Sequence, residues 1–217
     1  MKKNYFITGT DTDCGKTLVA AALLLKAAGL GLRTLGLKPL AAGAVQTDDG
    51  LRNSDAVQLQ QASTVKLAYE QVNPVLFEPP IAPHIAASQL GKRLSVASLA
   101  GFVRGAMLEP ADLRLIEGAG GWLVPVNEQE PLSALPKMLD LDVIMVVGLK
   151  LGCLNHALLT ARAIRQEGVR LAGWVATQTD PAMACVQENL DSLKNMLGAP
   201  CLGFIPYQEN ISPGQAM

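Results

Sequence analysis

The sequence predicts an α/β fold built on a doubly wound, mostly parallel sheet with helices on both faces. Six short apolar runs alternate with helix-like stretches along the chain, as in successive strand–helix–strand units. Most of these runs are continuously apolar, which is typical of parallel strands that helices cover on both sides. A turn that ends in Gly-Lys-Thr follows the first run, and ligands bind at such strand ends. Since no repeat or linker divides the chain, we expect a single domain over residues 1–217.

The expected elements follow one another in a regular alternation. Strands are expected at residues 5–7, 34–37, 113–116, 143–147, 171–176 and 201–205. Helices are expected at residues 18–28, 55–61, 94–107, 154–166 and 182–196. Right-handed crossovers between parallel strands would place these helices against the sheet. The proline-rich residues 73–83 are expected to cross the face that binds ligands.

The composition excludes several classes of function. Hydrophobic residues make up 49% of the chain and charged residues 17%, as in a folded protein with a large core. A net charge of −1 provides neither a basic surface for nucleic acid nor an attraction to an anionic membrane. The apolar runs are too short for a membrane span or a secretion signal. The four cysteines lack paired or metal-binding spacing, so we expect reduced thiols in a cytoplasmic protein.

The segment GTDTDCGKT, from Gly9 to Thr17, has the features of a phosphate-binding loop. It lies between the first strand and an apolar helix pattern, so backbone N–H groups and the helix dipole would face an anion. Lys16 would reach the terminal phosphates, and the Thr17 hydroxyl could ligate Mg²⁺. The usual pattern has its first glycine at position 10, where this chain has Thr10. A turn that merely contains a lysine does not account for Gly-Lys-Thr at a helix start, so the segment predicts a nucleoside triphosphate site.

Polar residues lie at or just beyond other strand ends. Lys38 follows the strand at 34–37, and Glu117 closes the strand at 113–116 before a glycine-rich turn. An acid at this place resembles the Walker B carboxylate that holds Mg²⁺. Lys38 could be an ordinary surface charge, but its position at a strand end beside the phosphate loop favours a ligand contact. Asp55 could either cap the helix at 55–61, as Asn53 or Ser54 could equally well, or approach the metal, and the residues alone favour neither.

The segment after the strand at 143–147 suits an anion. Lys150, Leu151, Gly152 and Cys153 lead into the helix expected at 154–166. Free backbone N–H groups at a helix start bind carboxylates and phosphates, and the helix dipole favours the negative charge. The segment therefore predicts a second anion site near the phosphate loop.

Together these segments resemble the dethiobiotin synthetase family, whose members are P-loop NTPase-like. The matching motifs are TGTDTDCGKT at 8–17, LKP at 37–39, LRNSDA at 51–56, EGAGGW at 117–122, KLGCLNHA at 150–157 and AGWVA at 172–176. They span nearly the whole chain in family order. Many NTPases share the phosphate loop, whereas EGAGGW and KLGCLNHA together are far more specific.

The resemblance implies an ATP-dependent cyclo-ligase that forms C–N bonds, with Mg²⁺ as cofactor and ATP as co-substrate. The reaction closes a cyclic urea on 7,8-diaminononanoate with CO₂ or bicarbonate and yields dethiobiotin, ADP and phosphate in biotin biosynthesis. It would pass through a carbamate and a carbamic–phosphoric anhydride. The resemblance also implies a homodimer with the substrate site at the subunit interface.

The resemblance also assigns site residues by position. Lys38 and Lys16 would be catalytic and neutralise phosphate and carbamate charge, and Thr17, Asp55 and Glu117 would hold Mg²⁺. The nucleotide would contact Asp13, Cys14, Gly15, Lys16, Thr17, Leu18, Asp55, Glu117, Gly118, Ala119, Gly120, Thr177, Gln178, Pro206 and Tyr207. The diamine would contact Thr12, Lys38, Ala42, Lys150, Leu151, Gly152, Cys153 and Asn155. The helix start at 150–155 would come from the partner subunit and receive the substrate carboxylate.

Three places depart from the family pattern. Many relatives have Glu where this chain has Asp13, which is one methylene shorter. Many have Ser where it has Ala42, and one missing neutral hydrogen bond costs on the order of 1 kcal/mol. Relatives often have Asn-Asp after the AGWVA strand, where this chain has Thr177 and Gln178, followed by Thr-Asp. Because Thr-Gln-Thr-Asp faintly resembles a guanine-reading pattern, the preference for ATP rests on the family and not on these residues.

Other nucleotide-binding classes fit the sequence less well. A partitioning ATPase of the deviant Walker type would carry a lysine at position 11, where this chain has Asp11. A GTPase would need a sound guanine motif, and a dinucleotide-dependent oxidoreductase would need G-x-G-x-x-G after the first strand. The alternative that remains is a non-catalytic, nucleotide-binding descendant of the family, because Ala42 removes one polar contact.

Overall fold

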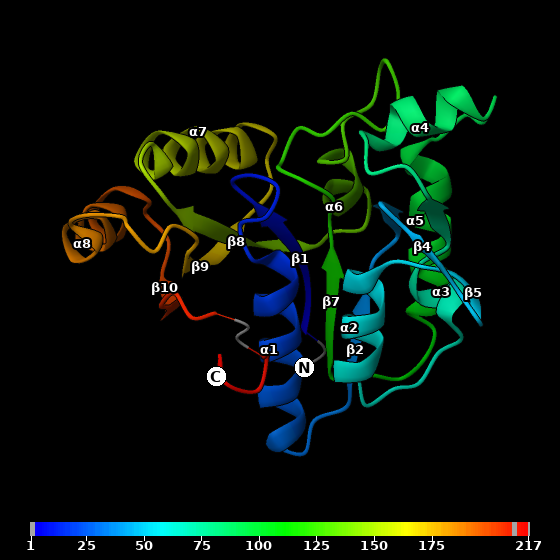
Figure 1. Ribbon diagram of the computed structural model, residues 1–217, viewed down its shortest axis with the longest axis horizontal. Coiled ribbons are helices and arrows are strands. Elements are labelled where there is room, and N and C mark those ends of the chain that lie inside the picture. Colours follow the sequence, from blue (N-terminus) through cyan, green and yellow to red (C-terminus); the bar gives the residue numbers. More distant parts are fainter. Residues whose placement is uncertain (1–2, 210–211, 217) are drawn as a thin grey trace.

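A six-stranded parallel sheet forms the centre of the molecule (Figure 1). The computed structural model describes residues 3–209 and 212–216. The strands lie in the order β10-β9-β8-β1-β7-β2, and every neighbouring pair is parallel. Their bounds are β1 Lys3–Gly9, β2 Thr34–Leu37, β7 Leu113–Glu117, β8 Asp142–Leu149, β9 Leu171–Gln178 and β10 Cys201–Ile205. The six predicted strands and the parallel α/β class are therefore confirmed.

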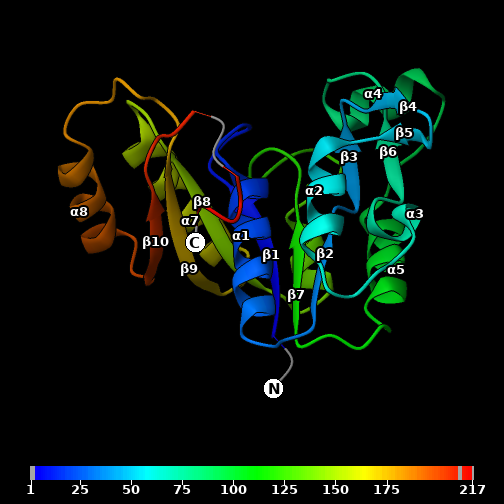
Figure 2. The ribbon, with the colours of Figure 1, turned by 60° about the horizontal axis from the view of Figure 1, so that its bottom comes forward.

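Helices cover both faces of this sheet (Figure 2). On one face lie α1 (Lys16–Gly29) and α2 (Ser54–Ala62). On the other lie α5 (Val96–Ala106), α6 (Ala134–Met138), α7 (Cys153–Gln166) and α8 (Val186–Met196). Neighbouring residues of β1 point to opposite faces of the sheet. Ile7 lies in the core beneath α1 and α2, and Phe6 lies in the core on the other face. Both faces bury apolar side chains, which accounts for the continuously apolar strands.

The order of the strands reverses at β1, and this reversal locates the site. From β1 the chain crosses through α1 to β2 at one edge, whereas β8, β9 and β10 extend toward the other edge. Loops that leave neighbouring strands in opposite directions open a crevice at the carboxyl ends of those strands. The phosphate loop follows β1 and therefore lies at this crevice.

Several short elements between β2 and α5 are absent from the sequence prediction. β3 (Leu40–Ala42) pairs with β6 (Val75–Phe77), and β4 (Val45–Thr47) pairs with β5 (Gly50–Arg52). The short helices α3 (Tyr69–Val72) and α4 (Pro83–Gln89) belong to the same region. Elements this short show no measurable periodicity in a sequence. The proline-rich residues 73–83 contain β6 and the first residue of α4.

The helix predicted at 182–196 begins later than expected, at Val186. Its N-cap, Cys185, has φ 54° and ψ 42°, a left-handed conformation that interrupts a right-handed helix. The other predicted helices differ from the observed ones by at most two residues at either end. Within the described ranges, no helix has the length and apolar character that crossing a membrane requires.

Candidate active site

The phosphate loop occupies the turn between β1 and α1, and its backbone depends on two glycines. Gly15, the N-cap of α1, has φ 86°, a conformation that favours glycine. A Cβ atom on Gly9 would lie 2.4 Å from Cys14 Sγ and 2.9 Å from the carbonyl oxygen of Asp11. No side chain fits there, so a glycine one position earlier than the usual pattern is a requirement of this loop.

The side chains of the loop divide between its floor and the open cleft. Cys14 is buried, and its thiol lies 3.5 Å from the carbonyl oxygen of Val146 in β8. Lys16 is also largely buried, and its ammonium donates to the carbonyl oxygen of Asp11 at 2.9 Å. The Thr17 hydroxyl donates to Glu117 Oε1 at 2.9 Å. Lys16 and Thr17 are therefore held ready at the start of α1 by groups on the loop and on β7.

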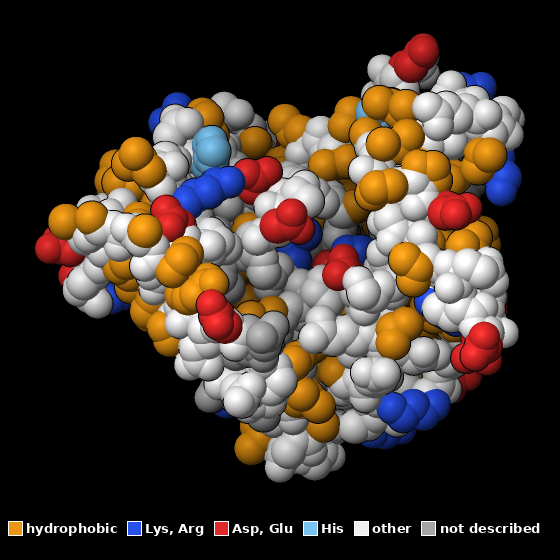
Figure 3. All heavy atoms as spheres, viewed as in Figure 1, with side chains coloured by type: hydrophobic (Ala, Val, Ile, Leu, Met, Phe, Trp, Pro, Cys, Tyr) orange, Lys and Arg blue, Asp and Glu red, His pale blue; other side chains and the backbone are white. Residues whose placement is uncertain are grey.

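Lys38 lies at the centre of an acidic cluster beside the loop. Its Nζ is 2.5 Å from Glu117 Oε1, 2.9 Å from Asp55 Oδ2 and 3.1 Å from the carbonyl oxygen of Gly118. Figure 3 shows basic and acidic side chains together in a hollow near the centre of this face. Lys38 is thus a ligand-facing residue of the crevice and not a solvated surface charge.

Lys38 and Asp55 hold each other in their charged forms. Burial alone would lower the pKa of Lys38, but the nearby carboxylates of Glu117 and Asp55 raise it above its ordinary value. Burial likewise would raise the pKa of Asp55, but the Lys38 ammonium and the Thr17 hydroxyl bring it below its ordinary value. We conclude that Lys38 is an ammonium and Asp55 a carboxylate at neutral pH.

The oxygen donors at this cluster fit Mg²⁺. Glu117 is fully buried, and its Oε2 atom has no hydrogen-bond partner among the described residues. Such an unpaired carboxylate oxygen is costly unless a cation or a donor fills the place beside it. Thr17, Asp55 and Glu117 together offer one hydroxyl and two carboxylates, and Mg²⁺ typically takes one or two carboxylates with phosphate oxygens and waters. In the described part of the chain no three His, Cys, Asp or Glu residues gather as a metal site, so phosphate would have to complete this one.

The uncertainty over Asp55 is resolved by its neighbour Asn53. Asn53 is the N-cap of α2, and its side-chain oxygen accepts the backbone N–H of Ala56 at 3.2 Å. Its amide also donates to the carbonyl oxygen of Ala42 at 3.3 Å. Asp55 is therefore released from capping, and its carboxylate faces Lys38 from the first turn of α2.

A cleft of about 940 Å³ joins the loop to the acidic cluster. Eleven of the predicted residues line it: Thr12, Asp13, Gly15, Lys16, Thr17, Leu18, Lys38, Ala42, Asp55, Ala119 and Gly120. Residues 80–83 form part of its wall, so the proline-rich section does cross the ligand face. Gly118 lies behind the wall, where a Cβ atom would approach the Phe6 ring to 2.8 Å. The glycine-rich turn after β7 therefore lets the backbone pass close to β1.

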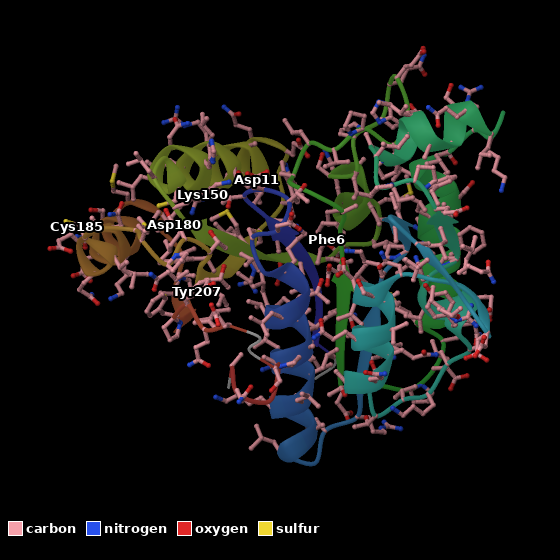
Figure 4. The ribbon with its side chains drawn as sticks, in the orientation of Figure 1. Phe6, Asp11, Lys150, Asp180, Cys185 and Tyr207 are labelled. Carbon is pink, nitrogen blue, oxygen red and sulfur yellow. The ribbon has the colours of Figure 1, made fainter. Side chains whose placement is uncertain are left out.

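The segment that precedes α7 lies outside this cleft, beside the tip of the phosphate loop. Lys150 Nζ is 2.8 Å from Asp11 Oδ2 (Figure 4). Gly152 caps α7 with φ 94° and no side-chain bond, so the first N–H groups of the helix lack a side-chain cap. Leu151 is almost fully exposed and Cys153 is buried, while Asn155 is exposed on the first turn. The anion site predicted here is therefore adjacent to the loop and open to solvent.

The residues predicted to surround the base divide into buried and exposed ones. Thr177 is buried, and its hydroxyl donates to the carbonyl oxygen of Cys14 at 2.5 Å. The Gln178 amide donates to the carbonyl oxygen of Asp180 at 3.1 Å and accepts the N–H of Tyr207 at 3.4 Å. Tyr207 itself is exposed, as is Pro206. The Thr177 hydroxyl is thus bonded to the loop that would hold the nucleotide.

Two residues of the site, Asn73 and Asp11, have no role in the sequence prediction. Asn73 is buried, and its amide donates to the carbonyl oxygen of Lys38 at 2.6 Å, which fixes the backbone at the strand end. Its signal was weak, a polar residue directly before a proline in an apolar stretch. Asp11 served in the sequence prediction only to exclude another class of protein. Asn53, by contrast, was predicted as one of the possible caps of α2, and the structure confirms it.

Comparison with known proteins places the chain among P-loop enzymes. The family described as "AAA domain" matches residues 3–215. The protein named ATP-dependent dethiobiotin synthetase BioD from Marinobacter nauticus is 53% identical over 210 residues, or 96% of this chain and 90% of that protein. The proteins of that name from Cellvibrio japonicus and Pseudomonas aeruginosa UCBPP-PA14 are 57% and 52% identical, over 94% and 96% of this chain and 90% and 92% of theirs.

Solved structures support the fold alone. The septum site-determining protein MinD from Pyrococcus horikoshii, complexed with Mg-ADP, matches with a TM-score of 0.59 at 15% identity, covering 99% of this chain and 92% of that one. A ParA family ATPase from Chlorobium tepidum matches with a TM-score of 0.58 at 12% identity, covering 100% of this chain and 90% of that one. At such low identity these likenesses confirm the P-loop NTPase-like architecture and carry no statement about activity.

Proposed function

The chain belongs to the ATP-dependent dethiobiotin synthetase family, and on that premise we propose that it makes dethiobiotin from 7,8-diaminononanoate, CO₂ and ATP. It is an ATP-dependent ligase of biotin biosynthesis, with ATP as co-substrate and Mg²⁺ as cofactor. The observation that carries the mechanism is the Lys38 ammonium, buried against Glu117 and Asp55 within reach of the phosphate loop. We take residues 1–217 as one catalytic domain.

The proposed reaction has three steps. One amine of the diamine adds to CO₂ and loses a proton, which gives a carbamate. A carbamate oxygen then bonds to the γ-phosphorus of ATP while the bond to ADP breaks, giving a carbamic–phosphoric anhydride. The second amine attacks the carbamoyl carbon and loses a proton, phosphate leaves, and the cyclic urea closes. Each step requires alignment and charge neutralisation rather than a protein nucleophile.

Lys38 and Lys16 supply the positive charge for these steps in our proposal. Lys16 donates to a backbone carbonyl of its own loop, and a triphosphate in the loop would take over this ammonium. Lys38 would hold the carbamate and stabilise the negative charge that develops during both transfers. Since burial strengthens such interactions, the near-complete burial of Lys38 supports this role.

Thr17, Asp55 and Glu117 would hold Mg²⁺, whose charge would neutralise phosphate oxygens. The unpaired Oε2 atom of Glu117 supports this assignment. The other nucleotide contacts that we propose are Asp13, Cys14, Gly15, Leu18, Gly118, Ala119, Gly120, Thr177, Gln178, Pro206 and Tyr207. Thr177 would act through its bond to the loop, and the side chain of Tyr207 would lie near the base.

The diamine would lie between the cleft and the start of α7. Thr12, Lys38 and Ala42 would contact its reacting end, and residues 150–153 and Asn155 would bind its carboxylate. We propose a homodimer in which one subunit provides the phosphate loop and its partner provides this helix start. We also propose that the protein acts in the cytoplasm.

The test is turnover of 7,8-diaminononanoate with bicarbonate and Mg-ATP, followed by detection of dethiobiotin and phosphate. We expect both products in equal amounts and none without Mg²⁺. Nucleotide binding without any dethiobiotin would reject the synthetase and favour a non-catalytic descendant of the family. Ala42, which lacks a hydroxyl, is the residue that motivates this alternative.

A further inference from the structure

Asp11 is the one acidic residue of the phosphate loop that contacts a side chain from another strand end. Its Oδ2 atom lies 2.8 Å from Lys150 Nζ, so the loop after β1 is linked to the loop after β8. Figure 4 shows the two residues next to each other between the phosphate loop and α7. The proposed reaction assigns Asp11 no role, because the residue neither lines the cleft nor approaches Lys38.

The remaining contacts of Asp11 connect it to the working parts of the loop. Its Oδ1 atom accepts the backbone N–H of Thr12 at 2.8 Å, which fixes the direction of the carboxylate. Its carbonyl oxygen accepts the Lys16 ammonium at 2.9 Å. The loop therefore presents the carboxylate of Asp11 toward Lys150 in one defined orientation.

Lys150 is held by this contact at the place where an anion is expected. In the part of the chain that the structure describes, its ammonium contacts only Asp11, so two of its three N–H donors remain available. The pairing raises the pKa of Lys150, and the Lys150 bond lowers the pKa of Asp11, so both groups stay charged. Lys150 stands three residues before Cys153, the first residue of α7, whose N–H groups favour a carboxylate.

We propose that Asp11 is a positioning residue that holds the Lys150 ammonium of its own subunit at the start of α7, where it would meet the carboxylate of a substrate whose reacting end lies at the other subunit's phosphate loop. This inference rests on the proposed function, since it names how that substrate is recognised. Without Asp11, the long side chain of Lys150 would sample many rotamers. The loss of this conformational entropy on binding would then weaken the affinity for the carboxylate. The effect is modest because the side chains of Lys150 and Asp11 are 43% and 46% exposed, and exposed ion pairs contribute little.

The test compares Asp11→Asn with the wild type on two ligands. Asn keeps an oxygen for the Thr12 N–H and removes only the charge that faces Lys150. The ligands are 7,8-diaminononanoate and an analogue of the same length in which a primary amide replaces the carboxylate. We expect Asp11→Asn to raise KM and the calorimetric Kd for the diamine about threefold to fivefold, with kcat changed less than about twofold. For the amide analogue, the wild type and the variant should bind equally.

Two further variants separate positioning from a structural effect. Lys150→Met should weaken the diamine at least as much, and adding Asp11→Asn to it should have no further effect, because Asp11 acts through Lys150. Asp11→Glu, which keeps the charge, should recover part of the affinity. The matched control is Asp142→Asn, which removes a similar ion pair with Arg170, 2.6 Å long, at the opposite end of β8. It should change none of these values.

Several results would overturn the inference. One is an Asp11→Asn protein whose Kd for the diamine equals that of the Asp142→Asn control. Another is an Asp11→Asn protein that loses as much affinity for the amide analogue as for the diamine. A wild type that makes dethiobiotin while Asp11→Asn matches the control would reject this inference alone. A wild type that binds the diamine without turnover would reject the proposed function, and the Kd values would still decide the role of Asp11.

Discussion

Replacing Lys38 by methionine should destabilise the protein and stop its reaction for separate reasons. Lys38 is 4% exposed and Glu117 is fully buried, and their charged atoms are 2.5 Å apart. Removing one partner of a buried ion pair typically costs about 3–5 kcal/mol, because the other charge stays buried and unpaired. For a domain of this size each kcal/mol lowers the midpoint of thermal unfolding by about 2–4 °C. We therefore expect a decrease on the order of 10 °C in the absence of nucleotide and Mg²⁺.

A second substitution separates the two effects of losing Lys38. Glu117→Gln removes the charge that Lys38→Met leaves unpaired, so the double variant should recover most of the lost stability. It should not recover dethiobiotin synthesis, because the ammonium that neutralises the transferring groups is still missing. Circular dichroism during heating measures the first effect, and a product assay with intact nucleotide binding measures the second. A Lys38→Met protein with wild-type stability, or with wild-type turnover, would refute this reasoning.

Three further predictions concern the same crevice, in addition to the test of Asp11 above. Between its ordinary pKa of 3.8 and neutral pH, the carboxylate of Asp55 contributes its full stabilisation, which is lost as the pH falls through its lowered folded pKa. Urea unfolding between pH 2 and 7 should therefore show a smaller loss of stability at acid pH for Asp55→Asn than for the wild type. An equal decrease in the free energy of unfolding for both proteins would contradict a stabilising ion pair between Asp55 and Lys38. Thr177→Val removes the bond to the loop carbonyl and should weaken ADP binding about fivefold, whereas Thr177→Ser should not; calorimetry that finds both alike would assign the effect to packing. Ala42→Ser supplies the hydroxyl that many relatives have and should lower KM for the diamine by up to about fivefold, and an unchanged KM in steady-state assays would place this residue away from the substrate.

The fold was predictable wherever the chain repeats one physical pattern. Continuous apolar runs located all six strands of the sheet because both faces are buried, as Phe6 and Ile7 illustrate. The region between β2 and α5 was not predictable in the same way. Its strands have three residues each, and β3 pairs with β6 across more than thirty residues, so no local pattern reports the pairing.

The site was predictable to the extent that strand ends converge on one edge of a parallel sheet. Lys38 and Glu117 follow or close strands, and the structure brings them within hydrogen-bond distance. Contacts that depend on side-chain direction were not accessible. Whether Asp55 capped its helix or faced Lys38 depended on Asn53 taking the cap. The burial of Thr177 beneath the phosphate loop depended on the spacing of β9 and the loop.

The transfer of oxygen from bicarbonate to phosphate tests the central claim most directly. If the carbamate of the substrate attacks the γ-phosphorus, one oxygen derived from bicarbonate must leave with the phosphate when the ring closes. With ¹⁸O-labelled bicarbonate, unlabelled ATP and the diamine, we predict one labelled oxygen in each phosphate released per dethiobiotin formed. Labelled dethiobiotin accompanied by unlabelled phosphate, or phosphate release without dethiobiotin, would contradict the mechanism built on Lys38 and the phosphate loop.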